Sequence, residues 1–397
     1  MLLINRNFTL LWGGQLVSQL GDKLYGIALL WWLLEKTGSP LTTSAFMVLA
    51  TLPEMLLGPL AGVCVDRWNR QVIVVASDAA RGVIVALLAW LLSARGLQVW
   101  QVYVAAFGIS ACSALANPAI QALIPSLVEP QALQGANARS QMISGVTRIV
   151  GPLAGAACVA AVGYLPVLLF NAASYLLCAL AECGLRCRPA AAPCRAPWWQ
   201  SLREGGRHMA GDVRVKTVVQ IVALVHVFFG ALIVILPFVA RRLAGHGIGN
   251  LGVLESALGA GIVVGAMWLA RRAVAARFAP PVFGMAACVL SLGLLQMLPL
   301  TSLTACAFCC AGIGLAVAFL SVHWQTAIQR DVPEALRGRV FSVLSSTGNV
   351  SVPLAMGATG LLLRVASPAS LLVWAALGLS AGGWLLAYRR AVPARAV

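Results

Sequence analysis

Long apolar stretches, separated by short polar segments, follow one another along the whole 397-residue sequence. Each stretch has roughly the 20 residues that an α-helix needs to cross a membrane. The stretches lack the alternation of polar and apolar residues that is typical of the strands of a membrane barrel. The pattern therefore predicts an all-α integral membrane protein with twelve transmembrane helices, over residues 8–34, 42–64, 71–94, 98–121, 140–163, 165–186, 217–240, 250–270, 281–300, 302–327, 340–364 and 368–388.

The composition supports this interpretation. Hydrophobic residues make up 60% of the chain and charged residues 10%, and the mean hydropathy is +0.88. A water-soluble protein of this length would leave much of that apolar surface in water. The first apolar stretch is long, contains Asp22 and lacks a clean small-residue cleavage site, so we expect it to remain in the protein as a helix rather than to be removed as a signal peptide.

The formal net charge of +16 raises the possibility of a nucleic-acid partner. With both termini in the cytoplasm, however, 20 of the 28 basic residues fall in the predicted inner loops and tails, and 5 fall in the outer loops. This asymmetry is the positive-inside pattern that orients membrane proteins. We therefore expect no nucleic-acid binding and a multi-pass protein of a bacterial inner membrane, with both termini cytoplasmic.

A short loop sequence occurs twice. PQALQG occupies residues 130–135, and PEALRG occupies residues 333–338, an offset of 203 residues. Each copy follows the fourth predicted helix of its half of the chain, on the cytoplasmic side. The repetition indicates that the chain consists of two similar halves.

A second pair of motifs shares the offset. Gly58 and Gly62 form a GxxxG pattern, and Gly261 and Gly265 form another 203 residues later. Small residues at this spacing let helices approach closely. We predict two six-helix domains, which are listed here with the basic cytoplasmic linker between them: 1–186, 187–216 (the linker) and 217–397.

Two six-helix halves in tandem are typical of the major facilitator superfamily. The segment GVCVDRWNR, residues 62–70, resembles this superfamily's Gly-x-x-x-Asp-Arg-x-Gly-Arg loop motif, with Asn69 in place of the second glycine. The segments NRNFTLLWGGQLVSQLGD, LPEMLLGPLAG, ANARSQ and QRDVPEALRGRVFS are similar to the macrolide-efflux and enterobactin-exporter branch of drug:proton antiporters. This resemblance covers essentially the whole chain.

The resemblance implies a cytoplasmic gate, in which charges at the rim separate and pair again as the halves rock. In this sequence, the matching residues are Gly62, Asp66, Arg67, Arg70, Arg337 and Arg339. The segment Gly151, Pro152 and Gly155 partly matches the antiporter motif of exporters and is predicted to be a hinge. The alternative is a packing bend with no role in transport.

Ionisable residues inside membrane helices are costly and are candidates for function. Gln15, Ser18, Gln19 and Asp22 recur at spacings of three and four, so they share one helical face. We predict that Asp22, and secondly Glu54, carries a coupling proton. The alternatives for Asp22 are a fixed ion pair with Arg81 or Arg148 and a hydrogen bond that only packs helices together.

The substrate cavity is predicted to contain Gln15, Gln19, Tyr25, Arg148 and His226. Arg148 is a candidate for holding an anionic substrate or for alternating between acidic partners. His226 has the alternative of a hydrogen-bonded packing residue.

Asp78 and Arg81 lie three residues apart in the third predicted helix. They are expected to neutralise each other as a structural pair.

The sequence has no GxxxxGK[ST] motif for ATP and no catalytic or metal-ligand cluster outside the apolar stretches. We expect no enzyme activity, no cofactor and no metal. The predicted function is proton-coupled export of an amphipathic small molecule, a drug or a siderophore, by a monomer in contact with membrane lipid. A lysophospholipid flippase, a siderophore importer and a non-transporting receptor on the same fold are the alternatives.

Overall fold

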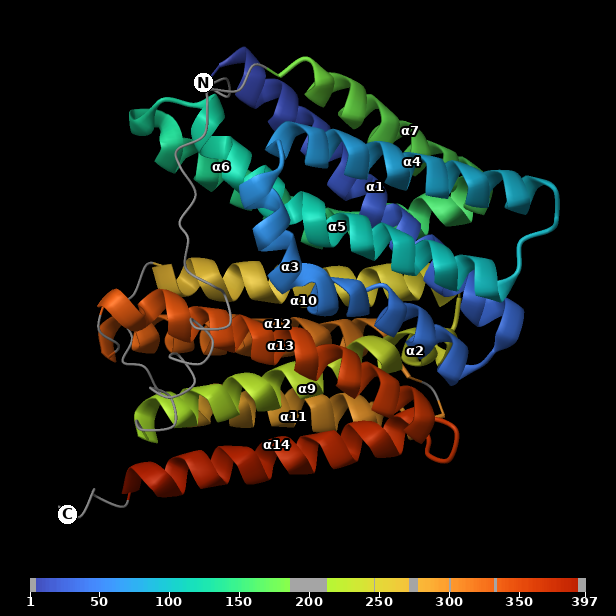
Figure 1. The fold of residues 1–397 in the computed structure, drawn as a ribbon. Helices are drawn as coiled ribbons and strands as arrows, with labels where there is room; N and C mark the ends of the chain where they lie inside the picture. The colour runs from blue at the N-terminus through green and yellow to red at the C-terminus, as the bar shows by residue number, and fades with distance from the viewer. Residues whose placement is uncertain are drawn as a thin grey trace. The chain divides into compact units, whose positions relative to one another are not determined.

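The computed structural model describes residues 5–185, 213–245, 247–270, 278–299, 301–331 and 334–391. Within these residues the chain is helical and contains no β-strand (Figure 1). The contacts divide it into two compact units, Met1–Arg195 and Ala196–Val397. Most of the predicted linker, 187–216, lies outside the described residues. We describe each unit by itself.

The first unit contains seven α-helices and one short 3₁₀ helix among its described residues. They are α1 (Arg6–Thr37), α2 (Pro40–Leu49), α3 (Leu52–Arg67), α4 (Arg70–Ser93), α5 (Val99–Leu127), η1 (Pro130–Ala132), α6 (Leu133–Val162) and α7 (Tyr164–Cys183).

The second unit contains six helices among its described residues. They are α9 (Val213–Arg242), α10 (Gly247–Ala270), α11 (Ala279–Leu295), α12 (Leu303–Asp331), α13 (Glu334–Leu362) and α14 (Pro368–Ala391).

Nine stretches of the described chain are long and apolar enough to cross a membrane, and two shorter apolar helices accompany them. Helix α1 is not among these eleven, because polar residues interrupt its apolar sequence. With α1, they correspond to the twelve predicted helices, and the predicted fold class is confirmed.

The second predicted helix, 42–64, is wrong as a single element, because the structure divides it into α2 and α3. Pro53 stands in the first turn of α3. Proline lacks an amide hydrogen, and its ring clashes with the carbonyl four residues earlier, so it ends the preceding helix. The Thr51 hydroxyl donates towards the carbonyls of Met47 and Val48, each 3.1 Å away, and so satisfies backbone groups that the break leaves open.

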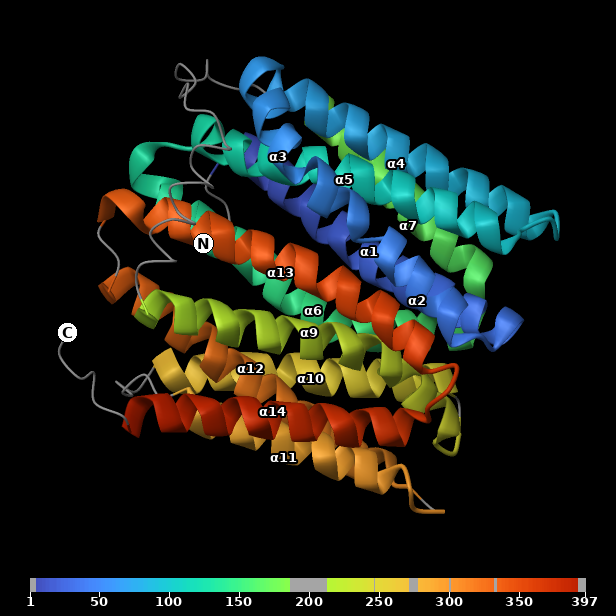
Figure 2. The same cartoon turned by 60° about the horizontal axis from the view of Figure 1, so that its bottom comes forward.

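In the first unit, α4 packs along α7 and α5, while α1 packs against α6 and α7 (Figures 1 and 2). The glycines of α6 allow a close approach to α1. A Cβ atom added to Gly155 would lie 3.0 Å from Leu24 Cα, and one added to Gly151 would lie 2.6 Å from Lys23 Cβ. These glycines therefore fix α6 against α1 beside Asp22.

In the second unit, α10 packs along α12, and α11 packs along α14 (Figure 2). The α10–α12 contact uses the predicted GxxxG pair. A Cβ atom on Gly265 would lie 2.9 Å from Ala318 Cβ, and one on Gly261 would collide with the Ala311 backbone. Gly58 of the first pair, by contrast, has no neighbour within 4 Å of such an atom among the described residues.

Candidate functional site

A polar network lies between α1, α4 and α7, in the interior of the first unit. Its centre is the ion pair between Arg81 Nη1 and Asp78 Oδ1, at 3.0 Å, which confirms the expected pairing on α4. Both side chains are buried, and Asp78 has no exposed surface. A buried ion pair is costly to desolvate and needs further hydrogen-bond partners to compensate for that cost.

Helix α7 brings Glu182 and Cys178 to the same place. One ligand-type atom from each of Asp78, Cys178 and Glu182 lies within 4.8 Å of the others, and all three residues are buried. Gln15 of α1 donates from Nε2 to Glu182 Oε1 at 3.2 Å. Cys178 Sγ lies 3.4 Å from the same Glu182 oxygen. The carboxyl group of Glu182 is thus held by two helices.

The network continues through Tyr175 to Asp22. The Arg81 guanidinium lies over the Tyr175 ring, 5.4 Å from its centroid, and the Tyr175 hydroxyl donates a hydrogen bond to Asp22 Oδ1. Tyr175 is fully buried, whereas Asp22 is partly exposed. The network therefore connects a half-buried carboxyl group on α1 with a fully buried acidic pair deeper in the unit.

The α7 members of this network were missed in the sequence, although a signal was present. Asn171, Tyr175, Cys178 and Glu182 recur at spacings of four, three and four, which places them on one helical face. All four are buried. A polar face on a helix inside an apolar bundle needs polar partners, and α1 and α4 supply them.

Within the network, three carboxyl groups and one guanidinium share a water-poor interior. Arg81 also interacts electrostatically with Asp22. Its Nε and Nη2 atoms have no hydrogen-bond partner among the described residues. The site therefore has one cation with unused donors beside more than one acid, an arrangement suited to holding protons and exchanging ion-pair partners.

The second predicted proton carrier, Glu54, interacts electrostatically with Arg81 and Asp22 but has its hydrogen-bond partner outside this network. It is exposed on α3 and accepts a hydrogen bond from Asn117 Nδ2 of α5 at 3.2 Å. Arg148 is exposed on α6, and the ion pair that Arg81 forms is with Asp78 rather than Asp22. Asp22 thus has Tyr175 as its hydrogen-bond partner in place of the fixed arginine pair considered from the sequence. This contact is a hydrogen bond between two helices, which was the other alternative, and the proton role stays a prediction.

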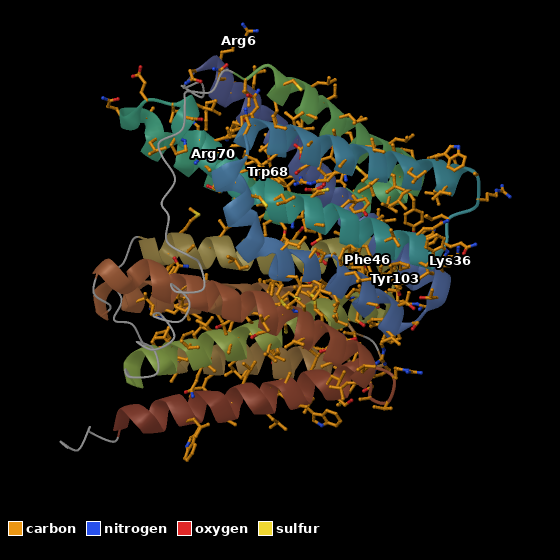
Figure 3. All side chains as sticks on the ribbon, viewed as in Figure 1. Arg6, Lys36, Phe46, Trp68, Arg70 and Tyr103 are labelled. Carbon is orange, nitrogen blue, oxygen red and sulfur yellow. The ribbon has the colours of Figure 1, made fainter. Side chains whose placement is uncertain are left out.

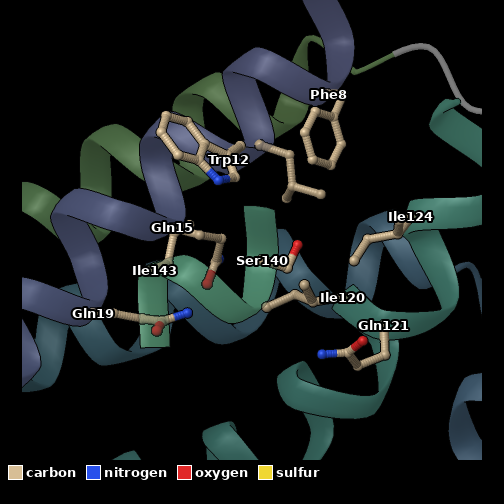
Figure 4. A pocket seen from close by; sticks show the side chains of 10 residues that line it. Phe8, Trp12, Gln15, Gln19, Ile120, Gln121, Ile124, Ser140 and Ile143 are labelled. Atoms are coloured by element: carbon tan, nitrogen blue, oxygen red, sulfur yellow. The ribbon is translucent and has the colours of Figure 1, made fainter. Parts of the chain in front are cut away.

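The predicted cavity residues are distributed over both units. Gln15 and Gln19 line a cavity of about 70 Å³ in the first unit, between α1, α5 and α6 (Figure 4). Its further lining residues are Phe8, Leu11, Trp12, Ile120, Gln121, Ile124, Ser140 and Ile143.

Tyr25 is buried in the first unit, and its hydroxyl has no partner among the described residues. His226 lies in the second unit, on α9. Its Nδ1 is 2.7 Å from the Val222 carbonyl, and a Cβ atom on Gly348 of α13 would lie 2.8 Å from its Nε2. The contacts of His226 are those of a packing residue between α9 and α13.

Of the predicted gate, Arg70 has a described side chain, close to Trp68 in the turn before α4 (Figure 3). Its Nη1 donates to the Ala122 carbonyl of α5 at 3.1 Å. The surroundings of the other predicted gate residues lie outside the described part of the structure. These residues are Gly62, Asp66, Arg67, Arg337 and Arg339. The predicted hinge, Gly151 to Gly155, is continuous α-helix in α6.

Comparison with known proteins gives a family match over most of the chain. Residues 11–356 match the sequence model of the Major Facilitator Superfamily. Macrolide efflux protein A of Streptococcus pyogenes is 23% identical over 359 residues, covering 88% of this chain and 87% of that protein. Multidrug efflux pump Tap of Mycobacterium tuberculosis is 26% identical over 354 residues, covering 86% and 83%.

Solved structures show the same fold. A bacterial homologue of the iron transporter ferroportin, in an inward-facing state, is 17% identical with a TM-score of 0.72, covering 96% of this chain and 97% of that chain. The POT family transporter PepTSo is 12% identical with a TM-score of 0.76, covering 97% and 98%. At these identities the likeness concerns the fold alone.

Proposed function

The chain belongs to the Major Facilitator Superfamily, and from this premise we propose that it is a proton-coupled exporter of amphipathic small molecules. Membership makes it a multi-pass membrane transporter rather than an enzyme, as the sequence predicted. Two relatives that match over most of their length are named as efflux proteins, for macrolides and for multiple drugs. This similarity favours outward transport of a drug-like compound, and a siderophore is the second substrate class.

The observation that carries the coupling proposal is the position of Asp22. Its carboxyl group is held by Tyr175 inside a membrane unit and interacts with Arg81. An acid within a membrane helix is costly unless it pairs with a charge or is neutralised by a proton. In the proposal, Asp22 takes a proton from outside, releases it inside, and thereby couples the proton gradient to substrate movement.

Alternating access is the form of transport that we propose. The two six-helix halves expose a central substrate site first to one side of a bacterial inner membrane and then to the other, as in other secondary transporters with repeated halves. Both termini are cytoplasmic in this arrangement, because it places most basic residues inside.

The test is drug accumulation in cells of a bacterial strain that lacks its own major efflux pumps. We expect cells with the wild-type protein to accumulate less radiolabelled macrolide than cells with the empty vector, and a protonophore to remove the difference. The Asp22→Asn variant should behave like the empty vector, because an amide cannot bind the coupling proton. Glu129→Gln is the matched control, since Glu129 is an exposed acid after α5, and it should transport as wild type.

Wild-type export by Asp22→Asn would contradict the proton role of this residue. Export that survives the protonophore would contradict proton coupling altogether. If macrolide levels are unchanged, the same strain is tested for loss of an iron chelator from the medium and for translocation of a fluorescent lysophospholipid. Uptake of the ferric chelator rather than its release would replace export with import.

A further inference from the structure

The acidic pair formed by Asp78 and Glu182 is separate from the predicted proton carriers, Asp22 and Glu54. Both residues have no exposed surface. Their carboxyl oxygens lie within 4.8 Å of each other, and the two groups interact electrostatically. Two carboxylates so close in a buried site repel each other strongly, so both cannot remain ionised without compensation.

The partners of the pair leave at least one oxygen of each carboxyl group without a hydrogen bond. Asp78 Oδ1 is paired with Arg81, and Glu182 Oε1 accepts from Gln15. Both oxygens of Asp78, and Glu182 Oε2, have no hydrogen-bond partner among the described residues, so the contact of Asp78 Oδ1 with Arg81 is an ion pair alone. An unsatisfied buried oxygen costs about 1–3 kcal/mol. One proton between the two carboxyl groups would make one of them a donor to the other.

The charges lead to the same conclusion. Fully ionised, Asp78 and Glu182 carry two negative charges, and Arg81 supplies one positive charge beside them. One added proton makes this group of three neutral, which is the state that a site of low dielectric constant favours.

We propose that Asp78 and Glu182 form a proton-binding site, which holds one proton shared between their carboxyl groups. The site rests on the proposed function only for its use in transport; proton binding itself does not depend on it. When the proton leaves for water, the pair becomes dianionic and holds Arg81. When the proton returns, Asp78 attracts Arg81 less strongly, and the unused Arg81 donors are available to Asp22. The pair thereby sets which acid Arg81 neutralises.

Several other ionisable groups act on the pair or on its neighbours Arg81 and Asp22. From α7 these are Tyr175 and Cys178; from α1, Asp22 and the exposed Lys23; from α5, Cys112; and from α3, the exposed Glu54. Tyr175 and Cys178 lie within the helix face that contacts α4, and both are neutral hydrogen-bond donors in their ordinary state. They solvate the acids without adding charge.

A divalent cation is the competing occupant of the space between Asp78, Cys178 and Glu182. The donors argue against it. Arg81 already supplies positive charge to Asp78, and Gln15 directs an N–H group at Glu182. A metal ion would have to displace or repel these groups and would need a deprotonated thiol. A proton needs neither change.

Infrared difference spectroscopy of the purified full-length protein in lipid nanodiscs tests the proposal. The spectrum in acidic buffer minus the spectrum in alkaline buffer should contain the C=O stretching band of a protonated carboxyl group. This band should shift in D₂O. Because the proton is shared, Asp78→Asn and Glu182→Gln should each remove the same band completely, and the double variant should remove nothing more. Glu129→Gln should leave the band unchanged.

Asn and Gln have almost the same shape as the acids they replace, and a monodisperse elution profile verifies folding. Carbodiimide labelling of the wild-type protein, mapped by mass spectrometry, gives a second measurement that needs no variant. We expect Glu182 or Asp78 to be modified in acidic buffer and protected in alkaline buffer. Two bands lost separately, or the absence of both the band and the label, would overturn the shared proton.

Titration with Zn²⁺ or Co²⁺ tests the competing occupant. Wild-type protein that binds one ion, with binding lost in Cys178→Ser, would also overturn the proposal; we expect no such binding. These experiments require no substrate. A shared proton in a protein that exports nothing would refute the proposed function alone, and macrolide export without the carboxyl band would refute the pair alone.

Discussion

Corresponding helices of the two units differ in the polarity of their buried contacts, which are polar in the first unit and apolar in the second. Helices α1, α4 and α7 of the first unit correspond to α9, α11 and α14 of the second. Adding the repeat offset of 203 residues to each network residue of the first unit gives an apolar residue or a glycine in the second. Gln15, Asp22, Asp78, Arg81, Tyr175, Cys178 and Glu182 become Val218, Val225, Pro281, Gly284, Gly378, Ala381 and Leu385.

The corresponding contact in the second unit, between α11 and α14, is apolar and well packed. The side chains of Val282, Met285, Val289 and Leu292 on α11 and of Leu372 on α14 have no exposed surface. The fold therefore does not need charges at this helix contact. Buried ion pairs are rarely more stabilising than apolar residues of similar volume. We infer that the first unit retains its acids and arginine for transport and not for stability.

The largest effect should come from breaking the ion pair on one side. Arg81→Met leaves Asp78 buried without its cation, and we expect the free energy of unfolding to fall by about 3–5 kcal/mol. The triple variant Asp78→Leu, Arg81→Met and Glu182→Leu gives α4 and α7 the apolar character of α11 and α14. It should recover most of that stability while transporting nothing. Thermal unfolding in detergent and macrolide accumulation measure the two properties. A triple variant that is as unstable as Arg81→Met would show that the charges hold the unit together.

A smaller loss of stability should distinguish the two GxxxG pairs from each other. Gly261→Ala puts a methyl group into the Ala311 backbone, and overpacking of this kind costs about 1–3 kcal/mol. Gly58→Ala, the same change 203 residues earlier, meets no described neighbour and should change stability by less than about 0.5 kcal/mol. Thermal unfolding of the two variants gives the comparison directly. Equal losses would show that Gly58 has a packing role that its described surroundings do not provide.

An effect on stability of the same order as that of Gly261→Ala should come from Tyr175→Phe, which removes one hydroxyl and keeps the ring over which Arg81 lies. The lost hydrogen bond to a carboxyl group is expected to cost about 1.5–3 kcal/mol if the bond is to the charged form, and about 1 kcal/mol if Asp22 is protonated. Drug export measured across a series of external pH values should also shift its optimum, because Asp22 loses a donor. An unchanged pH profile would separate Tyr175 from the coupling path. Tyr103→Phe, the same loss of one hydroxyl at a ring that donates to the Thr42 carbonyl outside the network, controls for the substitution itself.

The sequence predicted the helices well because length and hydropathy determine what can cross a membrane. It missed the break between α2 and α3, because Pro53 lies inside an apolar run and hydropathy does not show where a helix is interrupted. It identified Asp22 and the Asp78–Arg81 pair from local spacing. It did not assign Glu182 or Tyr175 to the site, since their partners Gln15 and Asp22 lie 167 and 153 residues away in sequence. Whether an acid near a helix end is exposed or enclosed is decided by the neighbouring helices.

The polarity of α1 has a consequence for how the protein is made. Asp22 and Lys23 near the centre of a membrane helix each cost about 2.5–3.5 kcal/mol during insertion. The Tyr175 hydroxyl that receives Asp22 belongs to a residue synthesised 153 positions later. Helix α1 therefore enters the bilayer before α7 has been synthesised, and the hydrogen bond to Asp22 forms only after α7 is inserted. The stable insertion of α1 thus depends on α7, the helix of the first unit that is synthesised last among those described.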